Sequence, residues 1–152
     1  MVNDQQVSTK TILEVKNLKT HFFTRRGTVR AVNDVSFELK PGETLGLVGE
    51  SGSGKTITCL SILRLLPRGA EIGGGDIVFD GQSTVGMTEK EMEGLRGGRI
   101  GMILQNSMAA LDPVFTIGTQ VAEPLVVHDK LPWKSAINKS IDLLRMVKIT
   151  AP

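Results

Sequence analysis

The spacing of hydrophobic and polar residues divides the chain into short strands and helices. In residues 35–39, three apolar side chains alternate with two polar ones, which is the period of a half-buried strand. Residues 44–48 form a short apolar run that is typical of a buried parallel strand. Further strands are predicted at residues 12–15, 76–79 and 99–104, the last of them buried.

Helical spacing is clearest after the glycine-rich stretch 49–54. Ile57, Leu60, Leu63 and Leu66 recur every three residues, which predicts a helix over residues 55–66 that is stopped by the proline and glycine after it. Two more helices are predicted at residues 117–127, with an interruption near Pro124, and at residues 132–149.

Turns and caps separate these elements. Thr88 and Glu91 have the spacing of a capping box, which predicts a short helix to about Leu95. Residues 80–81, Asp-Gly, are typical of a two-residue hairpin turn. The other predicted turns are residues 24–28 and 73–75. Antiparallel strands followed by a strand–loop–helix segment predict an α/β protein.

Composition narrows the class of protein. The chain has 152 residues, 40% of them hydrophobic, and a net charge of +2, which suits one globular domain and gives no electrostatic reason to expect nucleic-acid binding. No apolar run is long enough to cross a bilayer. Cys59 is the single cysteine, so no internal disulfide can form, and we expect an inert core thiol on a helix that packs onto the core. A solvated turn is expected for the basic residues Arg25, Arg26 and Arg30.

One motif carries specific chemistry. The pattern G-x-x-x-x-G-K-[ST] is matched by Gly49-Glu50-Ser51-Gly52-Ser53-Gly54-Lys55-Thr56. Its glycines let backbone N–H groups turn inward around an anion, and the small Ser51 and Ser53 can add donors. Lys55 can approach the β- and γ-phosphates, and the Thr56 hydroxyl can bind Mg²⁺. The loop therefore predicts binding of ATP or a related nucleoside triphosphate with Mg²⁺.

Four stretches around this loop occur in a characteristic order. They are residues 13–18 before Phe22-Phe23, residues 31–37 leading into 41–56, residues 75–81, and residues 99–105 continued by 111–118. Together they resemble the ATP-binding subunits of ABC transporters, and most closely the oligopeptide/dipeptide (peptide/nickel) importer branch. The resemblance implies the N-terminal half of a P-loop NTPase core with an antiparallel β subdomain. It places that core at 11–105 and the start of a truncated helical subdomain at 106–152, and the polar residues 1–10 before it are interpreted as a leader.

The resemblance also assigns roles outside the loop. An upstream aromatic residue stacks on adenine in this family, and its position falls on Phe22, with Phe23 as the second candidate. The family's Q-loop glutamine falls on Gln105, which implies contact with Mg²⁺ or with water, and the loop after it meets the membrane subunit. The sequence departs from the family's usual Phe, Asp and Pro here, with Leu104, Asn106 and Ser107.

Other parts of a complete ABC ATPase are not found in the sequence. Residues 95–99 resemble the signature motif superficially but lie before Gln105, so we interpret them as a turn. Residues 124–130 resemble the acidic strand that ends in Asp-Glu, but His128 interrupts the apolar run. We expect His128 and His21 to be surface residues. No catalytic residue is therefore identified, and we expect this chain alone to bind nucleotide with little hydrolysis.

The resemblance implies an ATP-binding subunit of an importer, with peptides as cargo, bound peripherally to the cytoplasmic face of the cell membrane. Its expected partners are membrane permease subunits, through the loop after Gln105, and a second ATP-binding subunit, but no nucleic acid. Two alternatives stay open. One is a soluble ABC-type ATPase that works without a membrane, and the other is a non-catalytic nucleotide-binding fragment.

Overall fold

The computed structural model describes residues 11–105 and 110–150. They belong to two compact units, Met1–Met92 and Glu93–Pro152. The predicted leader at residues 1–10 lies outside the described residues, and the predicted subdomain boundary after Gln105 stays a prediction. Among the described residues, no helix has both the length and the apolar content that crossing a membrane requires.

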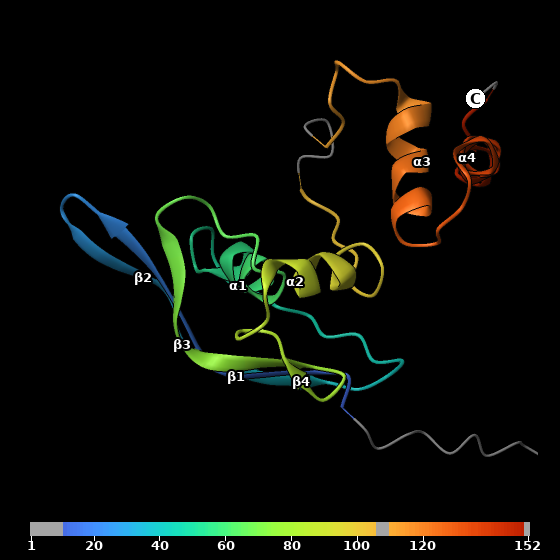
Figure 1. Cartoon of the computed structure of the whole chain (residues 1–152). Helices are drawn as coiled ribbons and strands as arrows, with labels where there is room; N and C mark the ends of the chain where they lie inside the picture. The colour runs from blue at the N-terminus through green and yellow to red at the C-terminus, as the bar shows by residue number, and fades with distance from the viewer. Residues whose placement is uncertain (1–10, 106–109, 151–152) are drawn as a thin grey trace, which may run out of the picture. The chain divides into compact units, whose positions relative to one another are not determined.

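The first unit is built on a four-stranded antiparallel sheet (Figure 1). Its strands, in the spatial order β2-β1-β3-β4, are β1 (Leu13–Thr24), β2 (Gly27–Leu39), β3 (Ala70–Phe79) and β4 (Gln82–Ser83). The strands β1 and β2 are longer than predicted because their pairing continues to the hairpin end, where Thr24 faces Gly27. The turn predicted at residues 24–28 is thereby confirmed.

Helix α1 (Lys55–Ile62) packs on this sheet. Its Ile57 and Ile62 contact a hydrophobic cluster of four buried residues, Val15, Leu18, Val32 and Ile77. Burial of such aliphatic side chains stabilises the packed arrangement by roughly 1.5–3 kcal/mol for each fully buried side chain. The cluster thereby joins the helix that follows the glycine-rich loop to the centre of the sheet.

The helix α1 ends four residues before its predicted end. Arg64 has a left-handed backbone (φ 52°), which ends the helical hydrogen bonding, and its guanidinium donates to the carbonyl oxygens of Thr84 (3.3 Å) and Met87 (2.5 Å). The helix thus ends before the proline and glycine that the prediction relied on. The expectation for Cys59 is also wrong, because its side chain is exposed, while Thr58 and Ser61 are the buried residues of α1.

The glycines at residues 73–75 do not form the predicted turn, since they lie within β3. Gly75 has φ +85°, and a Cβ atom there would lie only 2.4 Å from the carbonyl oxygens of Lys16 and Asn17. The pairing of β1 with β3 shifts register between Lys16 and Lys19. Glycine is therefore required because the two backbones approach closely at a bulge.

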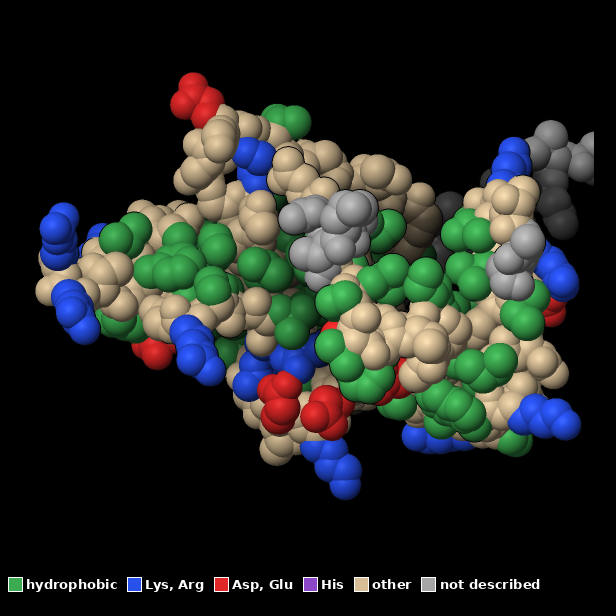
Figure 2. All heavy atoms as spheres, turned by 90° about the horizontal axis from the view of Figure 1, so that it is seen from above, with side chains coloured by type: hydrophobic (Ala, Val, Ile, Leu, Met, Phe, Trp, Pro, Cys, Tyr) green, Lys and Arg blue, Asp and Glu red, His purple; other side chains and the backbone are tan. Residues whose placement is uncertain are grey.

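The two predicted buried strands at residues 44–48 and 99–104 are also wrong. Both segments lack regular structure apart from an isolated bridge between Arg96 and Ile100. Val48 is 91% exposed and Ile103 is 95% exposed. A strand needs a hydrogen-bonded neighbour, and no described residue pairs with either segment along its length. Figure 2 shows hydrophobic side chains on the face of the molecule that it draws.

Two local predictions are confirmed. Asp80 (φ 49°) and Gly81 (φ 82°) both have left-handed backbones and form the two-residue turn between β3 and β4. Thr88 and Glu91 form the capping box of α2 (Glu89–Leu95), with the Thr88 amide 2.7 Å from the Glu91 carboxylate. The Thr88 hydroxyl and amide both donate to this carboxylate, which lowers the pKa of Glu91 below its ordinary value.

The second unit contains α3 (Ile117–Val127) and α4 (Trp133–Met146). Helix α3 continues through Pro124 without the predicted interruption, because the turn after the proline is closed by a bond from the His128 amide to the Pro124 carbonyl (2.8 Å). The apolar side of α4 lines a cavity of about 360 Å³ with residues of α3 and the segment after α4: Ile117, Gly118, Ile137, Ser140, Ile141, Leu144 and Ile149. The helix predicted at residues 132–149 is thereby confirmed, although it ends at Met146.

Candidate nucleotide-binding site

The glycine-rich loop has a backbone that other residues adopt with difficulty. Gly52 has φ +81° and Gly54 has φ +92°, both in the left-handed region. A Cβ atom on Gly54 would lie 2.3 Å from the carbonyl oxygen of Ala31, which belongs to β2. The last glycine of the motif is therefore required by both its backbone angle and its close approach to the sheet.

Lys55 folds back over the loop. Its ammonium group donates to the carbonyl oxygens of Gly49 (2.7 Å) and Glu50 (2.6 Å), and it lies 3.4 Å from the Ser53 hydroxyl. An ammonium group has three donors, and the longest of these contacts is the weakest. A phosphate oxygen could replace the Ser53 hydroxyl while the two carbonyl bonds hold the lysine in place.

The N-terminus of α1 is available to an anion. Gly54 is its N-cap, no side chain caps the helix, and no acidic residue lies in its first turn. The first amides of a helix have no partner within the helix and carry a partial positive charge, which favours phosphate. Thr56, in this first turn, is exposed, so its hydroxyl is accessible to a ligand or a metal ion.

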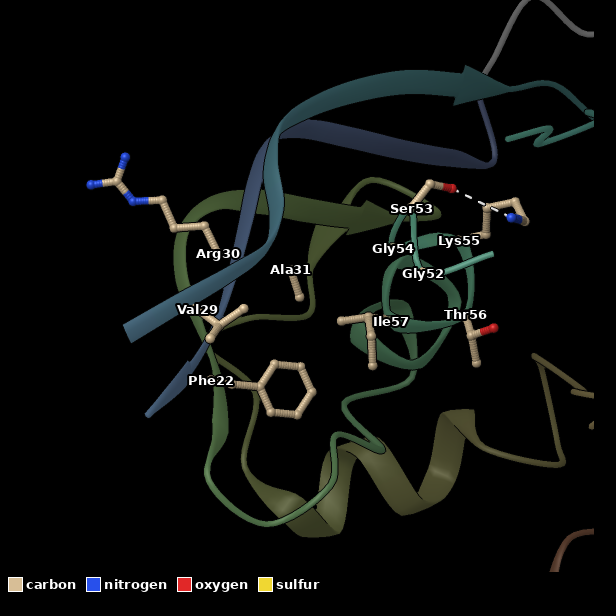
Figure 3. Close-up of a pocket in the computed structure, with 10 residues that line it drawn as sticks. All are labelled: Phe22, Val29, Arg30, Ala31, Gly52, Ser53, Gly54, Lys55, Thr56 and Ile57. Carbon is tan, nitrogen blue, oxygen red and sulfur yellow. Dashed lines mark hydrogen bonds between the residues drawn. The ribbon is translucent and has the colours of Figure 1, made fainter. Parts of the chain in front are cut away.

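A cavity of about 560 Å³ joins this helix end to the β1–β2 hairpin (Figure 3). Its lining residues are Phe22, Val29, Arg30, Ala31, Gly52, Ser53, Gly54, Lys55, Thr56 and Ile57. In Figure 3 the Phe22 ring lies on the side of Val29 and Ile57, while Lys55 lies at the far end beside Ser53. The cavity therefore has an apolar end and a polar, cationic end.

Strand geometry distinguishes the two candidate aromatic residues. Successive side chains of a strand point to opposite faces, so Phe22 and Phe23 cannot both face the cavity. Phe22 lines it and pairs with Val29 of β2, whereas Phe23 is 53% exposed and is not among the described residues that line it. The structure thus brings Phe22, and not Phe23, together with the phosphate loop.

Sequence reasoning missed the contribution of β2 to this cavity. Val29 and Ala31 line it, and so does Arg30, for which we expected only a solvated turn. The Arg30 side chain points away from Phe22 and Lys55 in Figure 3. The turn predicted at residues 24–28 could have indicated this contribution, because a hairpin closed there places Phe22 of β1 opposite Val29 of β2.

These residues fit a nucleoside triphosphate. The cavity volume lies within the range of roughly 300–1,000 Å³ that small-molecule sites have. Lys55 and the helix end suit phosphate, and the Phe22 face suits a planar base. For Mg²⁺ the structure offers the Thr56 hydroxyl, and no group of three His, Cys, Asp or Glu residues within the described ranges could hold a metal. Mg²⁺ would be held mainly by the phosphates, as is usual for nucleotide sites.

The remaining predicted site residue is not tested by this geometry. Gln105 is exposed and belongs to the second unit, so its contact with Mg²⁺ stays a prediction. Residues 106–109 of the loop after it lie outside the described residues.

Residues 95–99 form a turn as predicted, with bonds from the Gly97 amide to the Ile100 carbonyl and from the Arg99 amide to the Leu95 carbonyl, both of 2.9 Å.

Neither histidine is a fully exposed surface residue. A Cβ on Gly97 would lie 2.9 Å from His128 Nε2, so this half-buried ring packs against the turn. His21 is half-buried in the same way against Gly73.

Comparison with known proteins agrees with the loop and the fold. A family profile described as "ABC transporter" matches residues 32–151, which is most of the chain. The chain belongs to the ABC transporter family. The resemblance drawn from the sequence is thereby confirmed at the level of the family.

Similar ABC proteins have names that refer to peptides. The chain is 44% identical over 142 residues to a probable peptide ABC transporter ATP-binding protein of Sinorhizobium fredii, covering 93% of this chain and 42% of that protein. It is 42% identical over 142 residues to the oligopeptide transport ATP-binding protein OppD of Bacillus subtilis, covering 93% and 40%. The chain thus spans about two-fifths of the length of these curated relatives.

Solved structures show the fold. An ATP-binding cassette, MJ0796, in a dimeric post-hydrolysis state bound to ADP and phosphate, has a TM-score of 0.79 at 22% identity over 91% of this chain and 58% of that chain. The cbiO1 protein of Clostridium perfringens, part of an ABC transporter complex, has a TM-score of 0.63 at 20% identity over 92% and 51%. The fold is therefore that of an ABC ATP-binding cassette, as predicted.

Proposed function

We propose that this chain supplies the ATP-binding part of an energy-coupling subunit in an ABC importer for oligopeptides or dipeptides. The observation that carries the proposal is the cavity shared by Phe22 and the loop residues 52–56. The names of the similar proteins support peptides as the cargo. Cargo selection itself is expected to lie with the membrane and binding subunits.

Each part of the cavity has a proposed role. The Phe22 ring stacks on adenine, since an aromatic face attracts a planar base. The loop amides and Lys55 bind the β- and γ-phosphates, and the Thr56 hydroxyl orients Mg²⁺. Gln105 contacts the metal or the attacking water. When bound, Mg²⁺ neutralises charge on the phosphate oxygens.

Hydrolysis is proposed to need groups that these 152 residues do not supply. Neither a signature motif nor an apolar strand ending in Asp-Glu occurs in the sequence. Phosphoryl transfer depends on positioning and electrostatic stabilisation around the γ-phosphate. The chain alone therefore binds ATP with little turnover, and hydrolysis needs the missing signature motif and acidic strand, together with a second ATP-binding subunit. A non-catalytic nucleotide-binding role is the second candidate, favoured by the same missing residues.

The partner proposed for the loop after Gln105 is a membrane permease at the cytoplasmic face of the membrane. The described part of this loop supports it, because Val114 is 82% and Phe115 58% exposed. Gln120 holds the loop in shape, accepting from the Asp112 amide (2.8 Å) and donating to the carbonyl oxygens of Asp112 (2.8 Å) and Phe115 (3.0 Å). An ordered loop with exposed apolar side chains is suited to a protein contact.

The test is ATP binding measured by calorimetry for the wild-type chain and for Lys55→Ala. We expect binding to be lost in the variant, because the phosphates lose their charged donor. Lys134→Ala is the matched control, since Lys134 is an exposed lysine of α4 outside the cavity. Equal binding by wild type and Lys55→Ala would refute the proposal. Single-turnover hydrolysis by the chain alone would instead refute the expected lack of catalysis.

A further inference from the structure

The two ends of the nucleotide cavity come from segments far apart in the sequence. Phe22 lies on β1, whereas Lys55 begins α1. A ligand that spans both ends requires a fixed distance between the strand and the helix, because misplacement of a binding group by about 1 Å weakens its contribution strongly. A specific contact between α1 and the part of β1 near Phe22 is therefore expected.

A pair of buried hydroxyl groups lies at this junction. Thr20 of β1 and Ser61 of α1 are both 0% exposed, and their hydroxyl oxygens are 2.8 Å apart. The Ser61 hydroxyl also donates to the Ile57 carbonyl at 2.7 Å. A hydroxyl has one proton, and that of Ser61 is donated to the Ile57 carbonyl oxygen. Ser61 therefore accepts the hydrogen bond that the Thr20 hydroxyl donates. The bond therefore runs from the strand to the helix.

Thr20 lies where the pairing of β1 with its neighbouring strands is irregular. The pairing of β1 with β2 shifts register on both sides of Thr20, and its pairing with β3 shifts between Lys19 and Thr20. Such irregularities bend a strand and change the direction of the side chains that follow. Phe22 is the second residue after Thr20, and the regular pairing of residues 20–22 with β3 keeps the two side chains on the same face.

We infer that the hydrogen bond from Thr20 to Ser61 is a positioning contact that fixes the Phe22 end of β1 relative to the phosphate-binding helix. It contacts no nucleotide itself and acts through Phe22. The inference rests on the proposed nucleotide site and adds to it a determinant of how base and phosphates are bound together. Hydrophobic packing of Ile57 alone lacks the directionality that a hydrogen bond provides.

The test compares two ligands, ATP and tripolyphosphate, each with Mg²⁺, in calorimetry on the full chain. Tripolyphosphate needs the loop and Lys55 but not Phe22. In Thr20→Val, which keeps the side-chain shape, we expect ATP affinity to fall about tenfold and tripolyphosphate affinity to stay within about twofold of wild type. Thr20→Ser restores the hydroxyl and should restore ATP affinity.

Thr84→Val is the matched control. Thr84 is also 0% exposed, and its hydroxyl bonds to the Ile77 carbonyl (3.2 Å) away from the cavity, so this variant should bind both ligands as wild type does. Thermal melts of all variants verify folding. If Thr20→Val fails to fold, Ser61→Ala takes its place in the same comparison.

The inference would be overturned if a folded Thr20→Val lost affinity for both ligands equally, or lost no affinity for ATP. In either case ATP binding by the wild-type chain would leave the proposed function intact. Absence of ATP binding by wild type would overturn the proposed function and this inference with it.

Discussion

Replacement of Gly54 by alanine tests whether the phosphate loop is held by its contact with the sheet. The added Cβ would lie 2.3 Å from the Ala31 carbonyl oxygen, whereas real Cβ atoms essentially never approach within 3.0 Å. The loop and β2 would have to separate by at least about 0.7 Å, which is the difference between these distances. Gly52 provides the matched control, because it has a similar φ but no atom within 4 Å of a built Cβ.

The structure predicts that Gly52→Ala and Gly54→Ala lower the free energy of unfolding by different amounts. A non-glycine residue in the left-handed region costs roughly 1–2 kcal/mol, and this applies to both Gly52→Ala and Gly54→Ala. Overpacking against a backbone atom adds roughly 1–3 kcal/mol at Gly54 alone. We therefore expect Gly54→Ala to lower the free energy of unfolding by roughly 2–5 kcal/mol, and Gly52→Ala by roughly 1–2 kcal/mol.

Thermal and urea unfolding of the three proteins measure this difference. For a chain of this size, 1 kcal/mol corresponds to roughly 2–4 °C in Tm. Gly54→Ala should also lose ATP binding, since α1 and its amides move away from the cavity. Equal Tm values for Gly52→Ala and Gly54→Ala would refute the reasoning, because they would show that the close approach to Ala31 carries no energetic cost.

Three further outcomes are expected. Phe22→Ala should weaken ATP binding by about 1–3 kcal/mol and Phe23→Ala should have little effect in the same titration, because Phe22 alone of the two lines the cavity. Glu91→Gln should lower Tm at neutral pH. Its difference from wild type should vanish in acid, because the pKa of Glu91 is held below 4.5 by Thr88, so the stabilisation is present above that value and is lost as pH falls through the lowered pKa. Cys59 should react with a water-soluble thiol reagent in the folded protein nearly as fast as in urea, and protection of this thiol would contradict its exposure.

The parts of the fold that sequence reasoning predicted correctly are those that depend on neighbouring residues. The hairpin turn at residues 80–81 needs two left-handed residues, which Asp and Gly tolerate. The capping box needs a hydroxyl and a carboxylate three residues apart. The phosphate motif at residues 49–56 needs glycines and a lysine at fixed spacing. In each case the energetics are local, so the pattern carries the information.

Several of the errors concern contact, or the lack of it, with residues distant in the sequence. Residues 73–75 are as glycine-rich as a turn but pair with β1 across a bulge. Residues 44–48 are as apolar as a strand but have no neighbouring strand among the described residues. Arg64, just after α1, has a left-handed backbone and bonds to carbonyl oxygens that are distant in the sequence. The spacing of apolar residues predicts which side chains a segment could bury. Whether they are buried depends on the presence of another segment that packs against them.

The sequence by itself identified the motif of a phosphate-binding loop at residues 49–56, and its motifs indicated the ABC transporter family. The tertiary structure decided how a whole nucleotide could be held. It selected Phe22 over Phe23 through the alternation of β1, added the β2 residues opposite, and brought Thr20 onto Ser61. Phosphate binding depends on a few consecutive amides, whereas a base is bound by a surface that forms only when the strand and the helix pack together.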